Sequence, residues 1–548
     1  MTWTQIYDPL GHWWLSTLVA ALPILVLLGL LAGFRVSPHR CALAGAVTAI
    51  VAAVLAFHMP ATLAVVSFAY GVAFGLLKIA WIVVAAVFLY DISVETGQFE
   101  IMKQSVAAIT GDRRLQLLLV AFCFGAFIEG AAGFGAPVAI AGAFMIGLGF
   151  KPFHAAALNL IANTAPVAFG AIGTPVHTLA VVSALPEPQL NAMIGRILPL
   201  TALLIPLWLV RSMVSWRETW EVMPAIVVVG ASFAATQFFW SNYMDGNLVD
   251  ITSGVVSLVA TLIFLRFWQP MRICRFADEP PEAAAATQCH TAARIARAWM
   301  PFAILSVVVL LWGLPNIKTA LNKATTPAFA RGGWDVPLLH DAVLRAQPVV
   351  ARPAPEHAKY DFNWLSATGT SCFLSAILSG VLLGLGPKAM ARIFWRTLVR
   401  MRFAVLAISF MLGLGFVTRY SGMDAVLGLA FTRTGWLFPF FGTYLGWLGV
   451  ALTGSDTSSN ALFGGLQRIT AEQLRLSPVL MCAANSAGGV MGKMVDAQSI
   501  VVATAATNQV GNEGLIFRFV VWHSIALAAI VGAIVMAYAY WLPGLVPK

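Results

Sequence analysis

The sequence predicts an all-α polytopic membrane protein with an inverted repeat, two re-entrant helical hairpins and two broken crossing helices. The first observation is composition, because 59% of the 548 residues are apolar, 10% are charged and the mean hydropathy is +0.83. A soluble chain typically carries about 25% charged residues. The second observation is a repeat: Gly125 and Gly130 recur as Gly449 and Gly454, about 324 residues later, inside interrupted apolar segments. Paired interruptions of this kind are typical of the core of an inverted-repeat secondary transporter.

The first part of the chain, residues 1–94, is predicted to form N-terminal transmembrane helices. Residues 95–212 then form the core of the first repeat, with a hairpin over 114–149 and a broken helix over 153–183. The apolar runs here are too short to cross about 30 Å of hydrocarbon, which needs ~20 helical residues. We therefore expect the hairpin to enter and leave on one side, with its unwound backbone buried in protein or lining a cavity.

The middle of the chain, residues 213–363, is predicted to hold connecting transmembrane helices, a cytoplasmic loop over 268–297 and an external loop over 315–363. Basic residues gather on the cytoplasmic side of membrane proteins. The residues that mark this side are Arg266, Arg272, Arg275, Arg294 and Arg297. Counting crossings from them gives the two repeats opposite orientations. The net charge of +10 therefore reflects loop orientation and predicts no nucleic-acid partner.

The last part, residues 364–548, is predicted to contain the second repeat and a C-terminal helix. Its hairpin is expected over 436–468 and its broken helix over 476–507. We assign these segments because they match the interrupted segments of the first repeat at a nearly constant spacing.

The breaks in the two crossing helices are expected at residues 163–166 and 485–489. Pro166 removes a backbone donor, and paired glycines at 488 and 489 loosen a helix. Asn and hydroxyl side chains at these breaks can bond either the freed backbone or a ligand, and we expect both. The residues concerned are Asn163, Thr164, Asn485 and Ser486.

Asp456 is the most informative ionisable residue, because charged side chains inside membrane spans are costly. It lies at the predicted tip of the second hairpin, among hydrogen-bonding residues that include Thr453, Ser455, Thr457 and Ser458. One interpretation is a cluster that caps the returning helix. The other is a proton- or cation-coupling carboxylate beside a hydroxyl-rich substrate cradle. We favour coupling, because a cap does not need so many hydroxyl groups at this depth.

Glu129 lies at the matching place in the first repeat. It is either a structural carboxylate bound to backbone N–H groups or the second acid of a proton relay. The glycine-rich run after it offers bare backbone, and the helix that starts there presents N–H groups that bind anions. Close packing of helices through small residues is the alternative for this run. Its glycines are Gly130, Gly133 and Gly135.

Lys493 either pairs with Asp496 or attracts an anionic substrate, and we group it with the coupling residues. The six cysteines are scattered and form no CxxC pair, so we interpret them as small apolar side chains. No metal-binding, nucleotide-binding or hydrolase motif occurs in the sequence. We therefore expect no cofactor, no metal and no enzymatic activity.

The sequence resembles the bacterial L-lactate permease family. The segments that carry the resemblance span essentially the whole chain and include the Glu129 and Asp456 motifs. They are residues 7–9, 96–99, 129–137, 163–170, 362–370, 453–463, 492–494 and 498–500. The resemblance implies proton-coupled uptake of L-lactate, D-lactate or glycolate across the bacterial inner membrane. It also implies membership of the ion transporter superfamily, whose dicarboxylate members use inverted repeats with paired hairpins.

The sequence thus predicts a proton-coupled permease for small 2-hydroxymonocarboxylates, with the lipid bilayer as its surroundings. Its substrate site would comprise Gly130, Gly133, Gly135, Asn163, Thr164, Thr453, Ser455, Thr457, Ser458, Asn485 and Ser486. Its coupling residues would be Asp456, Glu129 and Lys493. A sodium-coupled carboxylate carrier is the alternative within transport, and a membrane-embedded enzyme is the alternative from another class. The sequence sets no oligomeric state.

Overall fold

The computed structural model describes residues 2–547 apart from 33–35, 132, 134–135, 277–289, 326–332, 351, 361 and 510–511. Among these residues, nine helices are long and apolar enough to cross a membrane, or ten if one bent pair counts as a span. The expected polytopic, helical membrane protein is therefore confirmed.

Long apolar helices form the N-terminal part. They are α1 (Trp13–Ala32), α2 (Pro38–Leu55), α3 (Ala61–Phe74), the π-helical turn η1 (Gly75–Ala80), α4 (Trp81–Glu95) and the short α5 (Gln98–Ala107). Helices α3 and α4 join through η1 into one span of 35 residues. Gly97 separates α4 from α5 with a φ of 71°, a left-handed conformation that glycine adopts readily.

The first repeat consists of short helices that pack closely. They are α6 (Arg113–Gln116), the π-helix η2 (Leu117–Phe124), α7 (Gly125–Ala131), α8 (Ala136–Gly147), α9 (Pro152–Ala162), the 3₁₀ turn η3 (Val167–Phe169) and α10 (Gly170–Ser183). Helix α8 packs back against both η2 and α7, so this segment folds as a helical hairpin. The two parts of the next helix are bent by 66° where α9 ends. Just beyond, residues 171–173 adopt left-handed backbone angles.

The connecting part contains helices and, together with the N-terminal strand β1, forms two small sheets that were not predicted from the sequence. The helices are α11 (Glu187–Met213), α12 (Trp216–Glu221), α13 (Met223–Tyr243), the 3₁₀ turn η4 (Gly246–Leu248), α14 (Val249–Phe267), α15 (Ala292–Gly313) and α16 (Pro315–Thr325). The strands are β1 (Trp3–Thr4), β2 (Trp334–Asp335), β3 (Val343–Arg345), β4 (Ala354–Pro355) and β5 (Lys359–Tyr360). Strand β3 pairs in parallel with β1 and antiparallel with β4, while β2 and β5 pair antiparallel.

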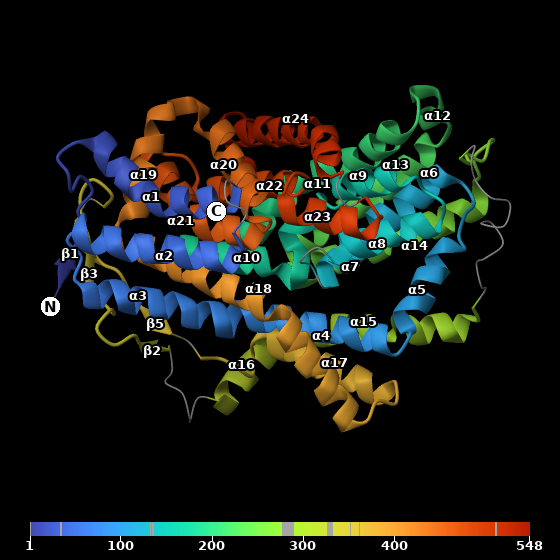
Figure 1. Ribbon diagram of the computed structural model, residues 1–548, viewed down its shortest axis with the longest axis horizontal. Helices are drawn as coiled ribbons and strands as arrows, with labels where there is room; N and C mark the ends of the chain where they lie inside the picture. Colours follow the sequence, from blue (N-terminus) through green and yellow to red (C-terminus); the bar gives the residue numbers. More distant parts are fainter. Residues whose placement is uncertain are drawn as a thin grey trace.

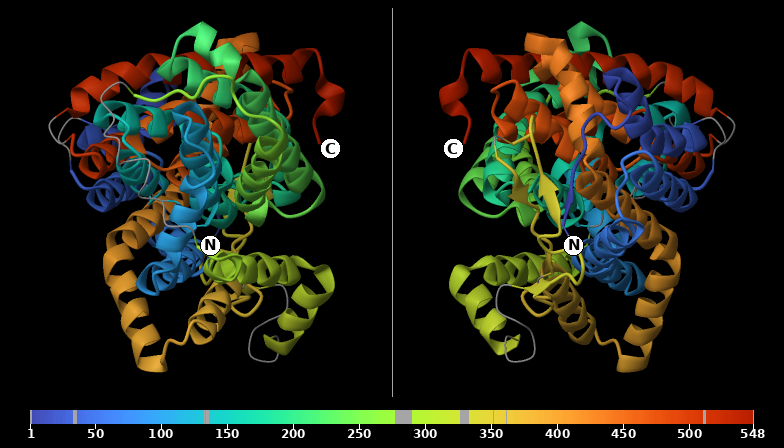
Figure 2. Two further views of the ribbon diagram at one scale, coloured as in Figure 1. Left: turned by 90° about the vertical axis from the view of Figure 1, so that its right-hand side faces the viewer. Right: turned by 90° about the vertical axis from the view of Figure 1, so that its left-hand side faces the viewer.

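The segment predicted as the second repeat is also helical. It comprises α17 (Thr368–Leu382), α18 (Pro387–Ser421), α19 (Met423–Phe431), the 3₁₀ turn η6 (Thr432–Leu437), α20 (Phe438–Thr453), α21 (Asp456–Gln473), α22 (Pro478–Gly492), α23 (Ala497–Ala506), α24 (Glu513–Tyr540) and the 3₁₀ turn η7 (Pro543–Leu545). Helices α20 and α21 pack against each other as the second hairpin. Figure 2 shows α17 and the start of α18, together with α15 and α16, projecting from one side of the helical body.

The expected break at residues 485–489 is wrong, because α22 continues through this segment to Gly492. The glycines in it serve close packing. A Cβ at Gly488 would lie 2.0 Å from the carbonyl oxygen of Thr443, and one at Gly492 would lie 2.3 Å from that of Trp447. They therefore let α22 approach the backbone of α20. The helix is interrupted at residues 493–496 instead, between α22 and α23.

The contacts between the two repeats are reciprocal. The returning arm of each hairpin packs on the second half of the other repeat's crossing helix, as α8 on α23 and α21 on α10. Helix α11, which follows the first repeat, packs on α22, and α24, which follows the second, packs on α9. The hairpin tips also match, with φ of 58° at Gly133 and 73° at Gly454.

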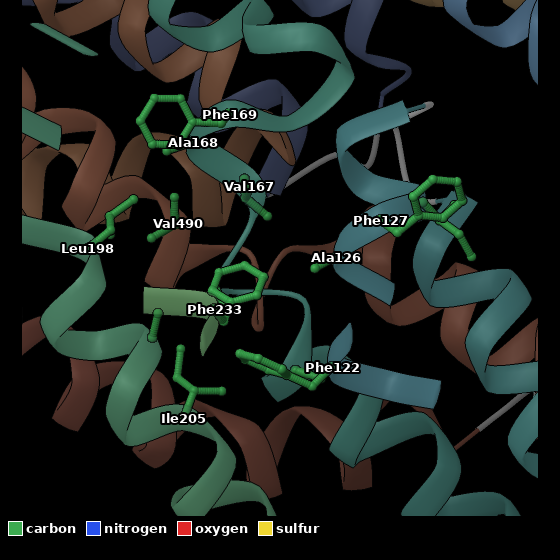
Figure 3. Close-up of a cluster of buried hydrophobic side chains, with 14 of the residues drawn as sticks. Phe122, Ala126, Phe127, Val167, Ala168, Phe169, Leu198, Ile205, Phe233 and Val490 are labelled. Carbon is green, nitrogen blue, oxygen red and sulfur yellow. The ribbon is translucent and has the colours of Figure 1, made fainter. Parts of the chain in front are cut away.

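The spanning helices run along the long axis of the molecule (Figure 1). The N-terminus and the small sheets lie at one end of this axis, and α12 and the start of α6 lie at the other. Helices α7, α10, α22 and α23 meet near its middle. A cluster of buried apolar side chains lines this region (Figure 3). In it, Phe122 of η2 and Phe233 of α13 face each other with ring centroids 4.9 Å apart.

Candidate functional site

The tip of the second hairpin turns within two residues. Gly454 ends α20 in a left-handed conformation, and Ser455 caps α21 by accepting a hydrogen bond from the backbone N–H of Ser458 at 3.3 Å. Thr453 donates its hydroxyl to the carbonyl of Gly449 at 2.7 Å. Ser455 therefore supplies the helix cap, and the carboxylate of Asp456 is available for other contacts.

Asp456 is buried at the centre of a polar network. Its Oδ2 accepts hydrogen bonds from the Ser486 hydroxyl at 2.5 Å and from the Asn460 amide at 3.2 Å. Its Oδ1 has no hydrogen-bond partner in the part of the chain that the structure describes. A Cβ at Gly489 would lie 2.2 Å from this oxygen, so the glycine is what gives it room. One face of the carboxylate is thus fixed and the other is uncommitted.

The network continues along α21 and α22. The Asn485 amide donates to Asn460 Oδ1 at 2.9 Å, and the Gln467 amide donates to Asn485 Oδ1 at 3.2 Å and to the Gly442 carbonyl at 2.6 Å. Asn460 also donates to the Pro175 carbonyl of α10 at 3.1 Å. Asn485 is therefore a link in a scaffold between hairpin and crossing helix, and the sequence analysis missed Asn460 and Gln467 as its neighbours.

Lys493 lies in the break between α22 and α23, beyond the segment 485–489 where the sequence predicted the break. Its ammonium group donates to the Gly454 carbonyl at 2.5 Å and lies 3.4 Å from Asp496 Oδ2. It is close enough to interact electrostatically with both Asp456 and Glu129. This buried cation therefore connects the acids of the two hairpins.

Glu129 occupies the last turn of α7 and is 4% exposed. Its Oε2 has no hydrogen-bond partner among the described residues. Its Oε1 lies where a side chain on Gly170 would be, because a Cβ there would come within 2.8 Å. Asn163 approaches the carboxylate but, among the described residues, its amide makes no hydrogen bond of ordinary geometry. Glu129 and Asn163 thus act on each other, while Glu129 Oε2 and both polar atoms of the Asn163 side chain have no hydrogen bond of ordinary geometry among the described residues.

The remaining predicted residues lie in several places. Gly130 packs against α14, and Gly133 packs against residue 171 of α10, where a Cβ would lie 2.8 Å from the alanine Cβ. Gly135 lies outside the described residues. The Thr164 hydroxyl donates to the Ile161 carbonyl of its own helix at 2.8 Å. Thr457 is buried in the first turn of α21.

The structure therefore brings together Asp456, Ser486, Asn485, Lys493, Glu129 and Asn163 around the break of α22 and α23. It also adds Asp250, a fully buried acid at the start of α14 whose charge interacts with that of Glu129. The signal for Asp250 was present in the sequence, because it is an acid at the edge of a predicted span.

Known proteins resemble this sequence along almost the whole chain. The family model described as L-lactate permease matches residues 16–542. The whole chain is 46% identical to glycolate permease GlcA of Escherichia coli (strain K12), over 99% of that protein. It is 45% identical to the L-lactate permease of Salmonella typhimurium (strain LT2), over the full length of both. A solved structure of Neisseria gonorrhoeae MtrF covers 87% of this chain and 83% of its own, with 12% identity and a TM-score of 0.44. On the family match and these identities, the chain belongs to the L-lactate permease family.

Proposed function

We propose that this protein carries lactate and glycolate across the bacterial cytoplasmic membrane together with protons. Family membership, and relatives named for L-lactate and glycolate, support the substrate class of small 2-hydroxymonocarboxylates. A permease needs no chemical step, so the site has only to bind a small anion, balance its charge and alternate its access.

The transport core is proposed to be an inverted repeat. The reciprocal packing of α8 on α23 and of α21 on α10 is what a two-fold relation between the repeats would produce. Opposite orientations also follow from the basic loops, with residues 268–297 proposed as cytoplasmic and 315–363 as external. Each hairpin can then open towards one side of the membrane while the other stays closed.

The observation that carries the coupling proposal is the position of Lys493. A buried charge is costly unless it is paired. Lys493 is 5% exposed and has Asp496, Asp456 and Glu129 within electrostatic reach. A substrate carboxylate can take the lysine as its counter-ion once a proton neutralises a competing acid. Substrate and proton would therefore bind together, which is the condition for symport.

Recognition of the substrate hydroxyl is proposed to involve the uncommitted groups near the same break. Asn163 has both amide atoms free of hydrogen bonds among the described residues, and Asp456 has one such oxygen. A site that binds a hydroxyl rejects an analogue lacking it, because its own polar atoms are left unpaired. Lactate and glycolate should therefore compete better than propionate and acetate.

The test is uptake of labelled lactate by proteoliposomes that contain the purified protein. An inward proton gradient should drive accumulation, and replacing Na⁺ with choline at a fixed gradient should leave it unchanged. Collapsing the gradient with a protonophore should reduce accumulation to equilibrium. Uptake that requires Na⁺ and ignores the proton gradient would establish the sodium-coupled alternative instead.

A further inference from the structure

Asp250 is a buried acid that the proposed coupling scheme does not use. It is the second residue of α14 and is 0% exposed. An acid in the first turn of a helix ordinarily binds the free N–H groups there. Neither carboxylate oxygen of Asp250 has a hydrogen-bond partner among the described residues. Helix capping therefore does not account for this residue, and leaving it ionised without a partner would be costly.

The first hairpin packs directly on Asp250. A Cβ at Gly130 would lie 2.9 Å from the Cβ of Asp250 and 2.7 Å from the backbone nitrogen of Ile251. A side chain larger than hydrogen at position 130 would therefore push α7 away from α14. The absence of a side chain at Gly130 therefore lets α7, which carries Glu129, pack against α14 at Asp250.

Glu129 and Asp250 are two buried carboxyl groups within electrostatic reach of each other, and both have uncommitted oxygens. Glu129 Oε2 and both carboxylate oxygens of Asp250 have no hydrogen-bond partner among the described residues. The charge of Glu129 acts on Asp250. Two buried carboxyls within electrostatic reach of each other cannot both be ionised at low cost, so we expect one of the two to be protonated.

Other titratable groups near this pair have partners of their own. His177 of α10 lies 2.7 Å from Oδ1 of Asn247, which is one turn before Asp250, and 2.8 Å from Glu187 Oε1. Asp245 accepts from the side chain of Asn247 at 2.8 Å. On the other side of the pair, the charges of Lys493 and Asp496 interact with the Glu129 carboxyl. Where η2 meets α14, the Cys123 and Ser257 side chains bond each other at 3.3 Å.

We propose that Asp250 and Glu129 form a pair of carboxyl groups that holds one proton, and that this proton travels with the substrate. Its role in transport rests on the proposed function, whereas the pair itself rests on the packing of α7 against α14 and on the burial and unpartnered oxygens of the two acids. Asp250 lies on α14, outside both repeats, and Glu129 lies on the hairpin. Displacing α7 from α14 would separate the carboxyls, and the proton would then no longer be shared. Hairpin movement and proton release would thus be one event.

Infrared spectroscopy of the purified protein tests the pair without any transport. We expect a protonated-carboxyl band at neutral pH in the wild type that Asp250→Asn removes, because Glu129 can then ionise alone. Glu129→Gln should keep this band but lower the pH at which it disappears, because Asp250 stays buried without a partner and no longer faces a like charge. The double variant should lose no second band. A matched control is Asp245→Asn, which alters the preceding turn and should keep the band. If each single variant removes a different band, or Asp250→Asn removes none, the pair does not exist.

The transport assay then tests the role of the proton. The pH of half-maximal lactate uptake should move towards acid by about one unit or more in Asp250→Asn, because a like charge no longer opposes ionisation of Glu129. Asp245→Asn should leave this pH unchanged. A lower maximal rate with an unaltered pH profile would make Asp250 a packing residue. Sodium-driven uptake would reject the proposed function, yet the infrared result would still decide whether the pair exists.

Discussion

The two hairpins share a backbone plan and differ in chemistry. Both turn at a glycine with positive φ, and each returning arm packs on the other repeat's crossing helix. In the second hairpin, hydrogen bonds from Ser486 and Asn460 fix one side of Asp456. Both acids leave one oxygen without a partner among the described residues, but in the first hairpin no hydrogen bond of ordinary geometry fixes Glu129. The comparison suggests that one hairpin mainly organises the site and the other mainly exchanges the proton.

The largest expected effect comes from removing the cation shared by the two hairpins. Lys493→Met should reduce proton-driven lactate uptake by roughly 30-fold or more, because the substrate carboxylate would lose its buried counter-ion, which costs about 2–5 kcal/mol of binding, and 1.4 kcal/mol is tenfold. Lys493→Arg keeps the charge and serves as the control, with partial uptake expected. The measurement is initial uptake into proteoliposomes at equal amounts of folded protein, judged by gel filtration. Near-normal uptake by Lys493→Met would show that the lysine does not balance the substrate.

The next largest effect distinguishes Asp456 from Glu129 by what each contributes to the free energy of unfolding and to transport. Asp456→Asn should lower the free energy of unfolding by about 1–2 kcal/mol, because Ser486 and Asn460 would then donate to a neutral amide oxygen, and hydrogen bonds to a charged carboxylate are stronger. Glu129→Gln should lower the free energy of unfolding by less, because the Glu129 carboxylate makes fewer hydrogen bonds than that of Asp456. Melting temperatures in detergent measure this difference.

Both of these variants should lose accumulation driven by a proton gradient while keeping lactate counterflow, which needs no net proton movement. Equal melting temperatures for the two would contradict the comparison. Normal accumulation by Asp456→Asn would leave Glu129 as the main coupling acid.

A smaller effect concerns substrate choice. Asn163→Ala should narrow the preference for lactate over propionate by roughly 10-fold or more, because its free amide is the group proposed to bind the hydroxyl. Asn485→Ala should instead lower stability and keep the preference, since Asn485 is bound on both sides by Asn460 and Gln467. Competition against labelled lactate gives both preferences. If Asn485→Ala alters the preference and Asn163→Ala does not, the roles of the two repeats are reversed.

The sequence predicted the order of the helices well and the local geometry of the site less well. Turn glycines, prolines and polar interruptions recur at a nearly constant spacing, so both hairpins were recognisable. The break in the second crossing helix was misplaced, because Gly488 and Gly489 are packing residues and a sequence does not distinguish them from helix breakers. Asp250 was missed because it lies outside the repeats at a position that is ordinary for a helix start. Strands of two or three residues are too short to show a period.

The smallest expected effect concerns the end of the molecule where the small sheets lie. A buried acid, Glu356, connects this end to the second hairpin. Glu356 is 5% exposed, and its two oxygens accept from Arg419 at 2.5 Å and from Arg345 at 2.6 Å. Arg419 also contacts the Val181 carbonyl at the end of α10, and Arg468 of α21 bonds the Ser183 carbonyl at 2.7 Å. These arginines thus link the segment 333–350 to α10 and the second hairpin.

Burial raises the pKa of Glu356, but Arg419 and Arg345 outweigh it and hold that pKa below its ordinary value of 4.5. A lowered pKa in the folded state means that the contribution to stability is complete above pH 4.5 and is lost as pH falls through the lowered value. Hydrogen–deuterium exchange, corrected for the intrinsic rate at each pH, should therefore show constant protection of residues 333–350 down to about this pH and a loss below it. Glu356→Gln should exchange faster throughout and lose the pH dependence, while Glu100→Gln, which removes an exposed pair with Lys103, should behave like the wild type. Protection that weakens between pH 8 and 6 would mean that a group other than Glu356 holds this end of the second hairpin.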